Sequence, residues 1–324
     1  MPENSIAAPA RLNYESERRR QLFMLKFKPL ELSDKEWIDE TTFGFSDNSA
    51  DYNFGNMYMW DHLFSRLVTR CEGRMVSLFG KTYADMFDFP VGKGDLVPVI
   101  EEMRLFARRQ SIPFRIRGVT PGHRLLLEQA FPGEFTFKAN RDQFDYVYSA
   151  EKLATLAGKK LHGKRNHINK FISQNEWSFE PMSREMIPEC SDMLDRWTME
   201  NREKLEFGLE TEHRAVNCGF KNFEALKLEG GVLRAGGRIA AFTIGEPISA
   251  DTYNVHFEKA GAGSDGAYQM INREFVRQIL QRYPDIRYIN REDDMGIANL
   301  RQAKSSYHPE FLTEKHTAYR ADRV

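Results

Sequence analysis

The chain has 324 residues, of which 41% are hydrophobic and 29% are charged, and its formal net charge is −1. This length suits two domains of about 150 residues, and the composition is typical of a soluble globular protein with a sizeable core. A net charge this close to zero excludes a global basic field that would make nucleic acid the main partner.

Three features of the sequence favour a cytoplasmic protein. The cysteines, Cys71, Cys190 and Cys218, are odd in number and far apart, which argues against a disulfide framework. No run approaches the roughly 18 apolar residues of a transmembrane helix. The N-terminal segment lacks the apolar core of a signal peptide, and we expect residues 1–22 to form a mobile tail.

The first half of the chain predicts alternating strands and helices. After an extended start at 27–32, the Ser-Asp-Lys-Glu sequence from Ser33 has the pattern of a capped helix start. The elements predicted next are a helical stretch at 54–64, strands at 67–71 and 75–80 around a turn, a strand at 84–89, a Gly-containing loop at 91–95, a helix to about residue 110, a strand at 114–118, a short helix after Gly122, and strands at 135–138 and 145–148.

A basic segment, residues 149–176, follows the first half. We expect one or two linker helices over 151–174, and the lysines and arginines there suit either a solvated surface or a contact with RNA phosphates. The spacing of His162 and His167 matches no zinc motif and no cysteine is close, so we expect no metal site.

The second half predicts the same order of elements. These are an extended segment at 177–182, helices at 183–200 and 212–221, a hairpin at 231–245 around a glycine turn, a strand at 251–257, a loop at 258–266, a long helix at 267–283, a strand at 286–290, a helix at 297–305, and a terminal pair of strands around 311 and 317–319. The separation of matched elements grows from about 150 to about 175 residues, as expected for two copies of one unit with insertions.

This order of elements resembles the GNAT acyltransferase superfamily. The resemblance implies an α/β (α+β) fold of two tandem GNAT-like domains, each a mixed central sheet flanked by helices. We place the first at 23–148, expect it to be non-catalytic, and place the second, catalytic domain at 177–324. In that family the loop before the long helix binds the pyrophosphate of coenzyme A, because glycines let backbone N–H groups approach phosphates at a helix N-terminus.

The residues at that loop position are the candidates for donor binding: Lys259, Gly261, Gly263 and Gly266. The spacing of the glycines is wider than is usual in the family, and Asp265 opposes a phosphate.

A second resemblance covers the chain from about residue 25 to its end. The sequences Gly296-Ile-Ala-Asn-Leu-Arg-Gln-Ala-Lys-Ser-Ser-Tyr-His-Pro309 and Ser49-Ala-Asp-Tyr-Asn-Phe-Gly-Asn-Met-Tyr-Met-Trp60, with Tyr319, resemble bacterial proteins of the phosphatidylglycerol lysyltransferase C-terminal-domain type. That family moves an aminoacyl group from aminoacyl-tRNA to a lipid head group. Its membrane-spanning domain has no counterpart in this sequence, so we expect an amine on a small molecule or peptide as acceptor rather than a lipid.

Four residues are candidates for catalysis. Tyr307 follows the helix after the fifth strand, where many GNAT enzymes have a tyrosine acid that protonates the leaving group; it also suits a packed aromatic residue before Pro309. Glu292 follows the fifth strand, where ligands collect in open α/β sheets. His256 and Glu258 alternate along the fourth strand and are expected to point to one face, either as a base or as a solvent-facing pair.

Two further residues are candidates for donor binding. Lys304 lies one helical turn before Tyr307 and suits a contact with a phosphate or with the 3′ end of a tRNA, or else a solvated helix lysine. Asn290 ends the fifth strand. An acidic run from Glu200 to Glu212 suits either a charged helix face or a surface that receives a cationic amine.

The sequence therefore predicts an acyl or aminoacyl transferase with acyl-CoA or aminoacyl-tRNA as donor, an amine acceptor and tRNA as a candidate partner. The alternative is a non-catalytic ligand-binding module that keeps the GNAT fold and has lost the donor site.

Overall fold

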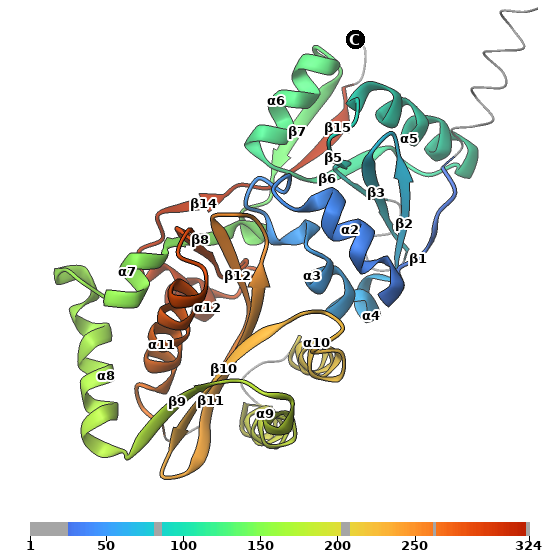
Figure 1. The fold of residues 1–324 in the computed structure, drawn as a ribbon. Coiled ribbons are helices and arrows are strands. Elements are labelled where there is room, and N and C mark those ends of the chain that lie inside the picture. The colour runs from blue at the N-terminus through green and yellow to red at the C-terminus, as the bar shows by residue number, and fades with distance from the viewer. Residues whose placement is uncertain (1–24, 81–85, 202–207, 262–263, 322–324) are drawn as a thin grey trace, which may run out of the picture.

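A computed structural model describes residues 25–80, 86–201, 208–261 and 264–321 (Figure 1). The predicted N-terminal tail and the first two residues of the strand predicted at 84–89 lie outside these ranges. Within the described ranges, no helix is long and apolar enough to cross a membrane.

The first sheet has the strand order β1-β2-β3-β4-β6-β15-β7, with β5 paired to β3. Thr120 begins the helix after β6 by accepting a hydrogen bond from the backbone N–H of His123, and Pro121 suits the first helical position. The elements are β1 (Lys28–Pro29), α2 (Lys35–Thr42), α3 (Phe54–Met59), α4 (Asp61–Phe64), β2 (Arg66–Cys71), β3 (Arg74–Phe79), β4 (Phe87–Asp88), β5 (Val91–Gly92), α5 (Leu96–Gln110), β6 (Arg115–Val119), α6 (Pro121–Ala130), β7 (Phe135–Ala139) and β15 (His316–Arg320).

The second sheet has the order β14-β8-β13-β12-β11-β10-β9. Helix α11 covers one face together with α7 and α8, and α9 and α10 cover the other (Figure 1). The elements are β8 (Asp145–Ser149), α7 (Ala150–Thr155), α8 (His162–Gln174), β9 (Trp177–Pro181), α9 (Ile187–Asn201), α10 (Leu209–Lys221), β10 (Glu229–Ala235), β11 (Arg238–Pro247), β12 (Thr252–Ala260), α11 (Ala267–Arg282), β13 (Tyr288–Asn290), α12 (Ala298–Ser305) and β14 (Phe311–Thr313), and short 3-10 turns occupy Leu32–Asp34, Ala50–Tyr52, Arg141–Gln143, Lys159–Leu161 and Arg184–Met186.

The two halves of the chain exchange a strand. β8, from the end of the first half, lies between β13 and β14 of the second sheet, and β15, from the end of the chain, lies between β6 and β7 of the first. The prediction that 145–148 pair within the first unit and 317–319 within the second was therefore wrong. A hydrophobic pattern identifies a strand without identifying its partner, because both sheets offer the same kind of apolar face.

Charged side chains join the two exchanged strands in the interior. Lys315 immediately precedes β15. Its ammonium group lies 2.8 Å from Asp145, at the start of β8, and 2.8 Å from Asp51. Both Lys315 and Asp145 have only 1% of their side-chain surface exposed. Helix α3 of the first half also packs against α10 of the second, so the apolar core is continuous between the halves.

Candidate functional site

Two strands separate at the centre of the second sheet. β12 and β13 pair in parallel from Thr252 and Tyr288 to Asn254 and Asn290, where β13 ends while β12 continues to Ala260. Ligands in open α/β sheets bind beyond the carboxyl ends of strands, where neighbouring connections separate. The residues that follow the end of β13 are therefore candidates for a ligand site.

A β-bulge in β12 lies at this separation. The register between β11 and β12 shifts after Ile244 and leaves His256 as the extra residue. The prediction that His256 and Glu258 share a face was wrong, because the bulge interrupts the alternation of side chains. His256 contacts Glu292, whereas Glu258 points to the other face and accepts a hydrogen bond from Asn272 of α11.

Glu292 is the centre of a buried polar cluster. Its Oε1 atom accepts hydrogen bonds from Asn254 Nδ2 at 2.8 Å, His256 Nδ1 at 2.9 Å and Asn56 Nδ2 at 3.2 Å, and Asn56 comes from α3 of the first half. Glu246 accepts a hydrogen bond from the other ring nitrogen of His256 at 3.1 Å. We call these five residues the Glu292 cluster; both halves of the chain contribute to it.

The backbone at Glu292 is unusual. Its φ of 58° lies in the left-handed region, which non-glycine residues rarely adopt outside functional or constrained sites. Asn290 Oδ1 accepts a 2.7 Å hydrogen bond from the Glu292 N–H, and the Lys304 ammonium group donates to the carbonyl oxygens of Arg291, Glu292 and Asp293. These contacts hold the carboxylate in one position.

The imidazole of His256 lies between two carboxylates. Burial on its own lowers the pKa of His256, but the hydrogen bonds to Glu246 and Glu292 outweigh burial and raise it to about 9. His256 is therefore an imidazolium near pH 7. In that state it donates to both carboxylates and does not act as a base.

This charge predicts a specific dependence of stability on pH. A histidine whose folded-state pKa is raised stabilises the protein fully below its unfolded pKa of about 6.5 and loses that contribution as pH rises through about 9. We expect the free energy of unfolding to fall by about 3 kcal/mol between pH 6 and pH 10 because of this group. Urea unfolding of His256→Gln should show a smaller fall, whereas His162→Gln, at an exposed position of α8, should keep the full fall; equal falls in all three proteins would contradict the assignment.

Arg291, Glu258 and Tyr307 lie on the opposite face of the separated strands. Arg291 donates to Glu258 at 2.9 Å, and its guanidinium carbon lies 5.0 Å from the centre of the Tyr307 ring. Arg291 Nη1 is buried and has no hydrogen-bond partner among the described residues. Burial raises the pKa of the Tyr307 hydroxyl, so that group keeps its proton.

The other predicted donor-binding residues make contacts within the chain. Lys304 supports the backbone after β13, and Asn290 donates to the Asn48 carbonyl at 2.7 Å and to Asp145 at 3.1 Å. Lys259 donates to Glu212 at 2.7 Å. Gly263 lies outside the described residues, as do residues 202–207 of the predicted acidic run.

The start of α11 lies against the linker helix α8. A Cβ atom at Gly266, where φ is +90°, would lie 2.3 Å from the backbone oxygen of His167. Asp265 accepts from His167 at 3.1 Å and from Lys170 at 2.6 Å. The N-terminus of α11 therefore has a carboxylate and a second helix beside it.

The corresponding loop of the first half is closed as well. A Cβ atom at Gly94 would lie 1.3 Å from the carbonyl oxygen of Glu72, and Arg74 donates to the Gly94 carbonyl at 2.7 Å. The Asp95 side chain accepts a hydrogen bond from the Val97 N–H in the first turn of α5. These contacts leave little space at the N-terminus of α5.

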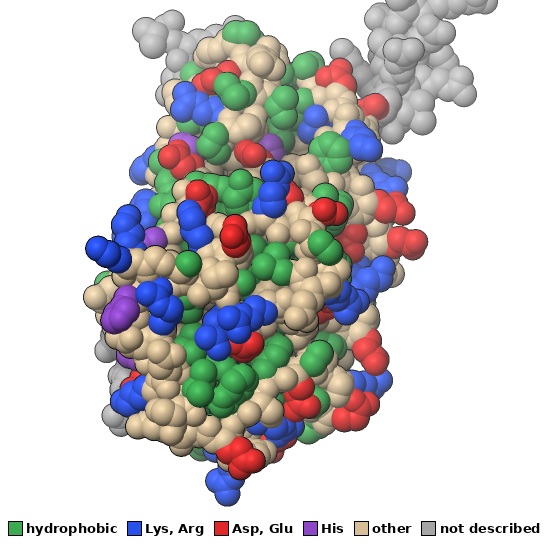
Figure 2. All heavy atoms as spheres, turned by 60° about the vertical axis from the view of Figure 1, so that its left-hand side comes forward, with side chains coloured by type: hydrophobic (Ala, Val, Ile, Leu, Met, Phe, Trp, Pro, Cys, Tyr) green, Lys and Arg blue, Asp and Glu red, His purple; other side chains and the backbone are tan. Residues whose placement is uncertain are grey.

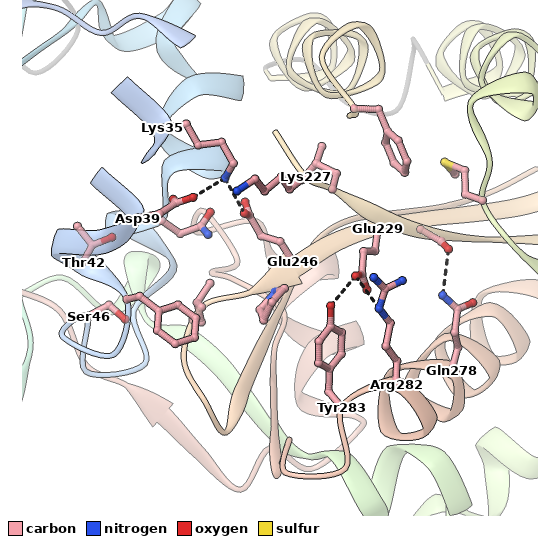
Figure 3. A pocket seen from close by; sticks show the side chains of 18 of the residues that line it. Lys35, Asp39, Thr42, Ser46, Lys227, Glu229, Glu246, Gln278, Arg282 and Tyr283 are labelled. Carbon is pink, nitrogen blue, oxygen red and sulfur yellow. Dashed lines mark hydrogen bonds and ion pairs between the residues drawn. The ribbon is translucent and has the colours of Figure 1, made fainter. Parts of the chain in front are cut away.

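A cavity of about 600 Å3 lies between the two halves (Figure 3). Its walls come from α2 and the turn after it, from the ends of β9, β10 and β11, and from the last turn of α11. Glu246 links the cavity to the Glu292 cluster, because its side chain lines the cavity and also pairs with His256. Among the described residues, no three His, Cys, Asp or Glu side chains are arranged to hold a metal ion.

Three residues of the site, Glu246, Asn56 and Arg291, were not among those predicted from the sequence. Asn56 lies in the segment that carried the family resemblance, and Arg291 directly follows Asn290, so both had a sequence signal. Glu246 had none, because a glutamate near the end of a strand is ordinarily solvated.

Comparisons with known proteins identify the family. A family model described as phosphatidylglycerol lysyltransferase, C-terminal, matches residues 43–319. A structure of a protein of unknown function from Bacteroides thetaiotaomicron is 37% identical, with 92% of this chain and 100% of that chain covered and a TM-score of 0.87. An uncharacterised protein from Mycoplasmoides gallisepticum is 26% identical over 175 residues, and the chain spans only 54% of that relative.

Two more distant structures share the fold. The C-terminal domain of a putative lysylphosphatidylglycerol synthetase from Agrobacterium fabrum is 14% identical, with 90% of this chain and 92% of that chain covered and a TM-score of 0.63. L-PGS from Bacillus licheniformis is 17% identical, with 100% and 95% covered and a TM-score of 0.53. The fold is two tandem GNAT-like domains, each a mixed sheet flanked by helices, and the chain belongs to the phosphatidylglycerol lysyltransferase C-terminal family, a family of GNAT-like transferases.

Proposed function

We propose that this protein transfers an aminoacyl group from aminoacyl-tRNA to an amine. The observation that carries the proposal is the Glu292 carboxylate at the separation of β12 and β13. One of its oxygens is anchored by three donors, and the other makes no hydrogen bond to a described residue. A fixed carboxylate with a free oxygen is suited to accept a proton from a nucleophile.

In the proposed reaction, residues on both faces of the sheet act at the point where β12 and β13 separate. The acceptor nitrogen attacks the ester carbonyl of the donor, a C–N bond forms, and the bond to the ribose oxygen breaks. Glu292 takes the proton from the amine, and Asn254 Oδ1, which is buried without a partner among the described residues, accepts a second amine hydrogen. The free Nη1 of Arg291 polarises the carbonyl, and Tyr307 returns a proton to the departing ribose oxygen.

The surroundings of α11 favour tRNA over coenzyme A as donor. A pyrophosphate needs accessible backbone N–H groups and positive charge. At this helix N-terminus the Asp265 carboxylate is adjacent, and α8 packs directly against Gly266. α8 itself carries Lys164, Arg165 and Lys170 and no acidic residue. Figure 2 shows basic side chains and histidines gathered at the left of the face on this side, whereas its right edge carries both basic and acidic side chains; basic groups are what a phosphate backbone contacts.

The first half contributes Asn56 to the site and carries no donor site of its own in this proposal. The close contact of Gly94 with the β2–β3 turn supports this assignment, because it leaves a phosphate no room at α5. The role of the first half is then to complete the Glu292 cluster and one wall of the cavity.

Thermal unfolding with each donor tests the proposal without knowledge of the acceptor. A ligand that binds the folded state stabilises it by about 2.7 kcal/mol at a hundred times its dissociation constant. We expect a rise in the unfolding midpoint with aminoacyl-tRNA, a smaller rise with uncharged tRNA, and none with acetyl-CoA or CoA. Label transferred from charged tRNA to an amine would then establish the reaction.

Two other results would replace the proposal. A rise with acetyl-CoA alone would make the protein an acyl-CoA-dependent transferase. No rise with either donor would favour the alternative function, a ligand-binding module that keeps the fold without the transfer reaction.

A further inference from the structure

The cavity between the two halves is lined by equal numbers of cationic and anionic side chains. Lys35 lies 2.8 Å from Asp39 and 3.5 Å from Glu246, and these three groups form one wall (Figure 3). The cationic lining residues are Lys35, Lys227 and Arg282, and the anionic ones are Asp39, Glu229 and Glu246. A net-neutral ligand that carries both charges is complementary to such a lining, whereas a hydrocarbon chain would leave charged groups without water or partners.

One cation of the lining, Lys227, has no hydrogen-bond or ion-pair partner among the residues that the structure describes. Lys227 lies in the connection between α10 and β10. Figure 3 shows its side chain extending toward Lys35 and Glu246 at the cavity wall. Its backbone φ of 54° is left-handed, which fixes the direction in which the side chain leaves the chain. An anionic ligand group that bound there would gain a charge-assisted contact.

The opposite wall offers acceptors to a cation. Glu229 accepts hydrogen bonds from the Tyr283 hydroxyl at 2.6 Å and pairs with Arg282 at 3.1 Å, both through Oε1. Its Oε2 atom has only a long contact, 3.5 Å, with the hydroxyl of Tyr253. Gln278 lies beside it and donates to the Gly230 carbonyl, while its Oε1 atom is buried with no partner in the described part of the chain. These two oxygens suit an ammonium or an amide N–H.

We infer that the cavity binds a small zwitterion of the amino-acid or short-peptide class, with its carboxylate at Lys227 and its amino end at Glu229 and Gln278. The cavity volume of about 600 Å3 lies in the range of pockets that enclose small molecules. Because Glu246 joins this cavity to His256, the ligand would sit next to the Glu292 cluster. The amino end is held at Glu229 and Gln278, away from Glu292, so this ligand is not assigned the role of amine acceptor and its binding does not rest on the proposed function.

Calorimetric titration of the whole chain with L-alanyl-L-alanine tests the inference. Two analogues each remove one charge: the N-acetyl dipeptide lacks the ammonium group, and the dipeptide amide lacks the carboxylate. We expect each analogue to bind at least about tenfold more weakly than the dipeptide, as for loss of a charge-assisted contact. Vesicles of phosphatidylglycerol form the third arm, which presents an anionic head group on a lipid.

The matched variants are Lys227→Met against Lys221→Met, and Glu229→Gln against Glu224→Gln. Lys227 and both control residues are exposed, and the controls do not line the cavity. Lys227→Met should weaken the dipeptide about tenfold and abolish its advantage over the dipeptide amide, and Lys221→Met should change neither. Equal binding of dipeptide and amide to the wild type, an unchanged affinity in Lys227→Met, or binding of vesicles but not of the dipeptide would each overturn the inference.

The titration also separates this inference from the proposed function. It requires no donor, because it measures binding of the dipeptide to the protein alone. Absent dipeptide binding together with a tRNA-dependent rise in the unfolding midpoint would reject the zwitterion and leave the transferase proposal in place.

Discussion

Replacing Lys315 by methionine is expected to lower the free energy of unfolding by about 3–5 kcal/mol, because it removes one partner of a buried ion pair and leaves the other charge uncompensated. Lys315 holds Asp145 and Asp51, each at 2.8 Å. Burial raises the pKa of Asp51, but Lys315 and Arg117 lower it to about 2, so this carboxylate depends on its cationic neighbours. Urea unfolding followed by circular dichroism at pH 7 measures the loss.

The exchanged strands explain why the loss is global. Asp145 begins β8 in the second sheet and also accepts hydrogen bonds from the Ala50 N–H at 2.9 Å and from Asn290 at 3.1 Å. Lys315 precedes β15, which completes the first sheet. A repelling pair of carboxylates at this point would separate both strands from their sheets and weaken the two halves together.

Two further variants make this result specific. Lys138→Met removes an exposed lysine from β7, opposite Thr317 of β15, and should change stability by no more than about 0.5 kcal/mol. Lys315→Met combined with Asp145→Asn should lose less stability than Lys315→Met alone, because one of the uncompensated charges is then gone. An unchanged stability of Lys315→Met would show that the buried network does not hold the exchange together.

The local elements could be predicted from the sequence because they depend on local signals. The hairpin of β10 and β11 follows from two apolar runs around Gly236 and Gly237, both with positive φ, and the helices follow from apolar periodicity. The exchange of β8 and β15 could not be predicted in this way. Their buried charges, Asp145 and Lys315, are 170 residues apart, and a one-dimensional pattern contains no sign that they meet.

The candidate site was predictable in part for a similar reason. The end of β13 marked Glu292, since ligands collect beyond the carboxyl ends of strands. β12 itself contains no glycine or proline that would signal the bulge at His256, although Gly245 of β11 lies opposite it, and a single extra residue reversed the direction of every later side chain on β12. The sequence also suggested a phosphate contact for Lys304, whereas its ammonium group supports the backbone of the site from within.

Glu292→Gln is expected to slow aminoacyl transfer by about 10²–10⁴-fold, the usual contribution of a general base. Glutamine has nearly the same shape and keeps an oxygen that can accept from Asn254 and Asn56, but it cannot take a proton from the attacking amine. Single-turnover transfer of labelled amino acid from charged tRNA at saturating acceptor measures the step. Glu310→Gln, an exposed residue after α12, is the matched control and should transfer at the wild-type rate.

The variant also separates proton transfer from simple loss of structure. A glutamine beside His256 lacks one of the two carboxylates that raise the pKa of this imidazole, so stability at pH 7 should fall and its dependence on pH between 6 and 10 should flatten, as in His256→Gln. His256→Gln, however, keeps the Glu292 carboxylate with its bonds from Asn254 and Asn56, and it should therefore retain more transfer activity than Glu292→Gln. An equal loss of transfer activity in the two variants would mean that Glu292 and His256 act by maintaining the structure of the site. Full activity of Glu292→Gln would mean that another group is the general base.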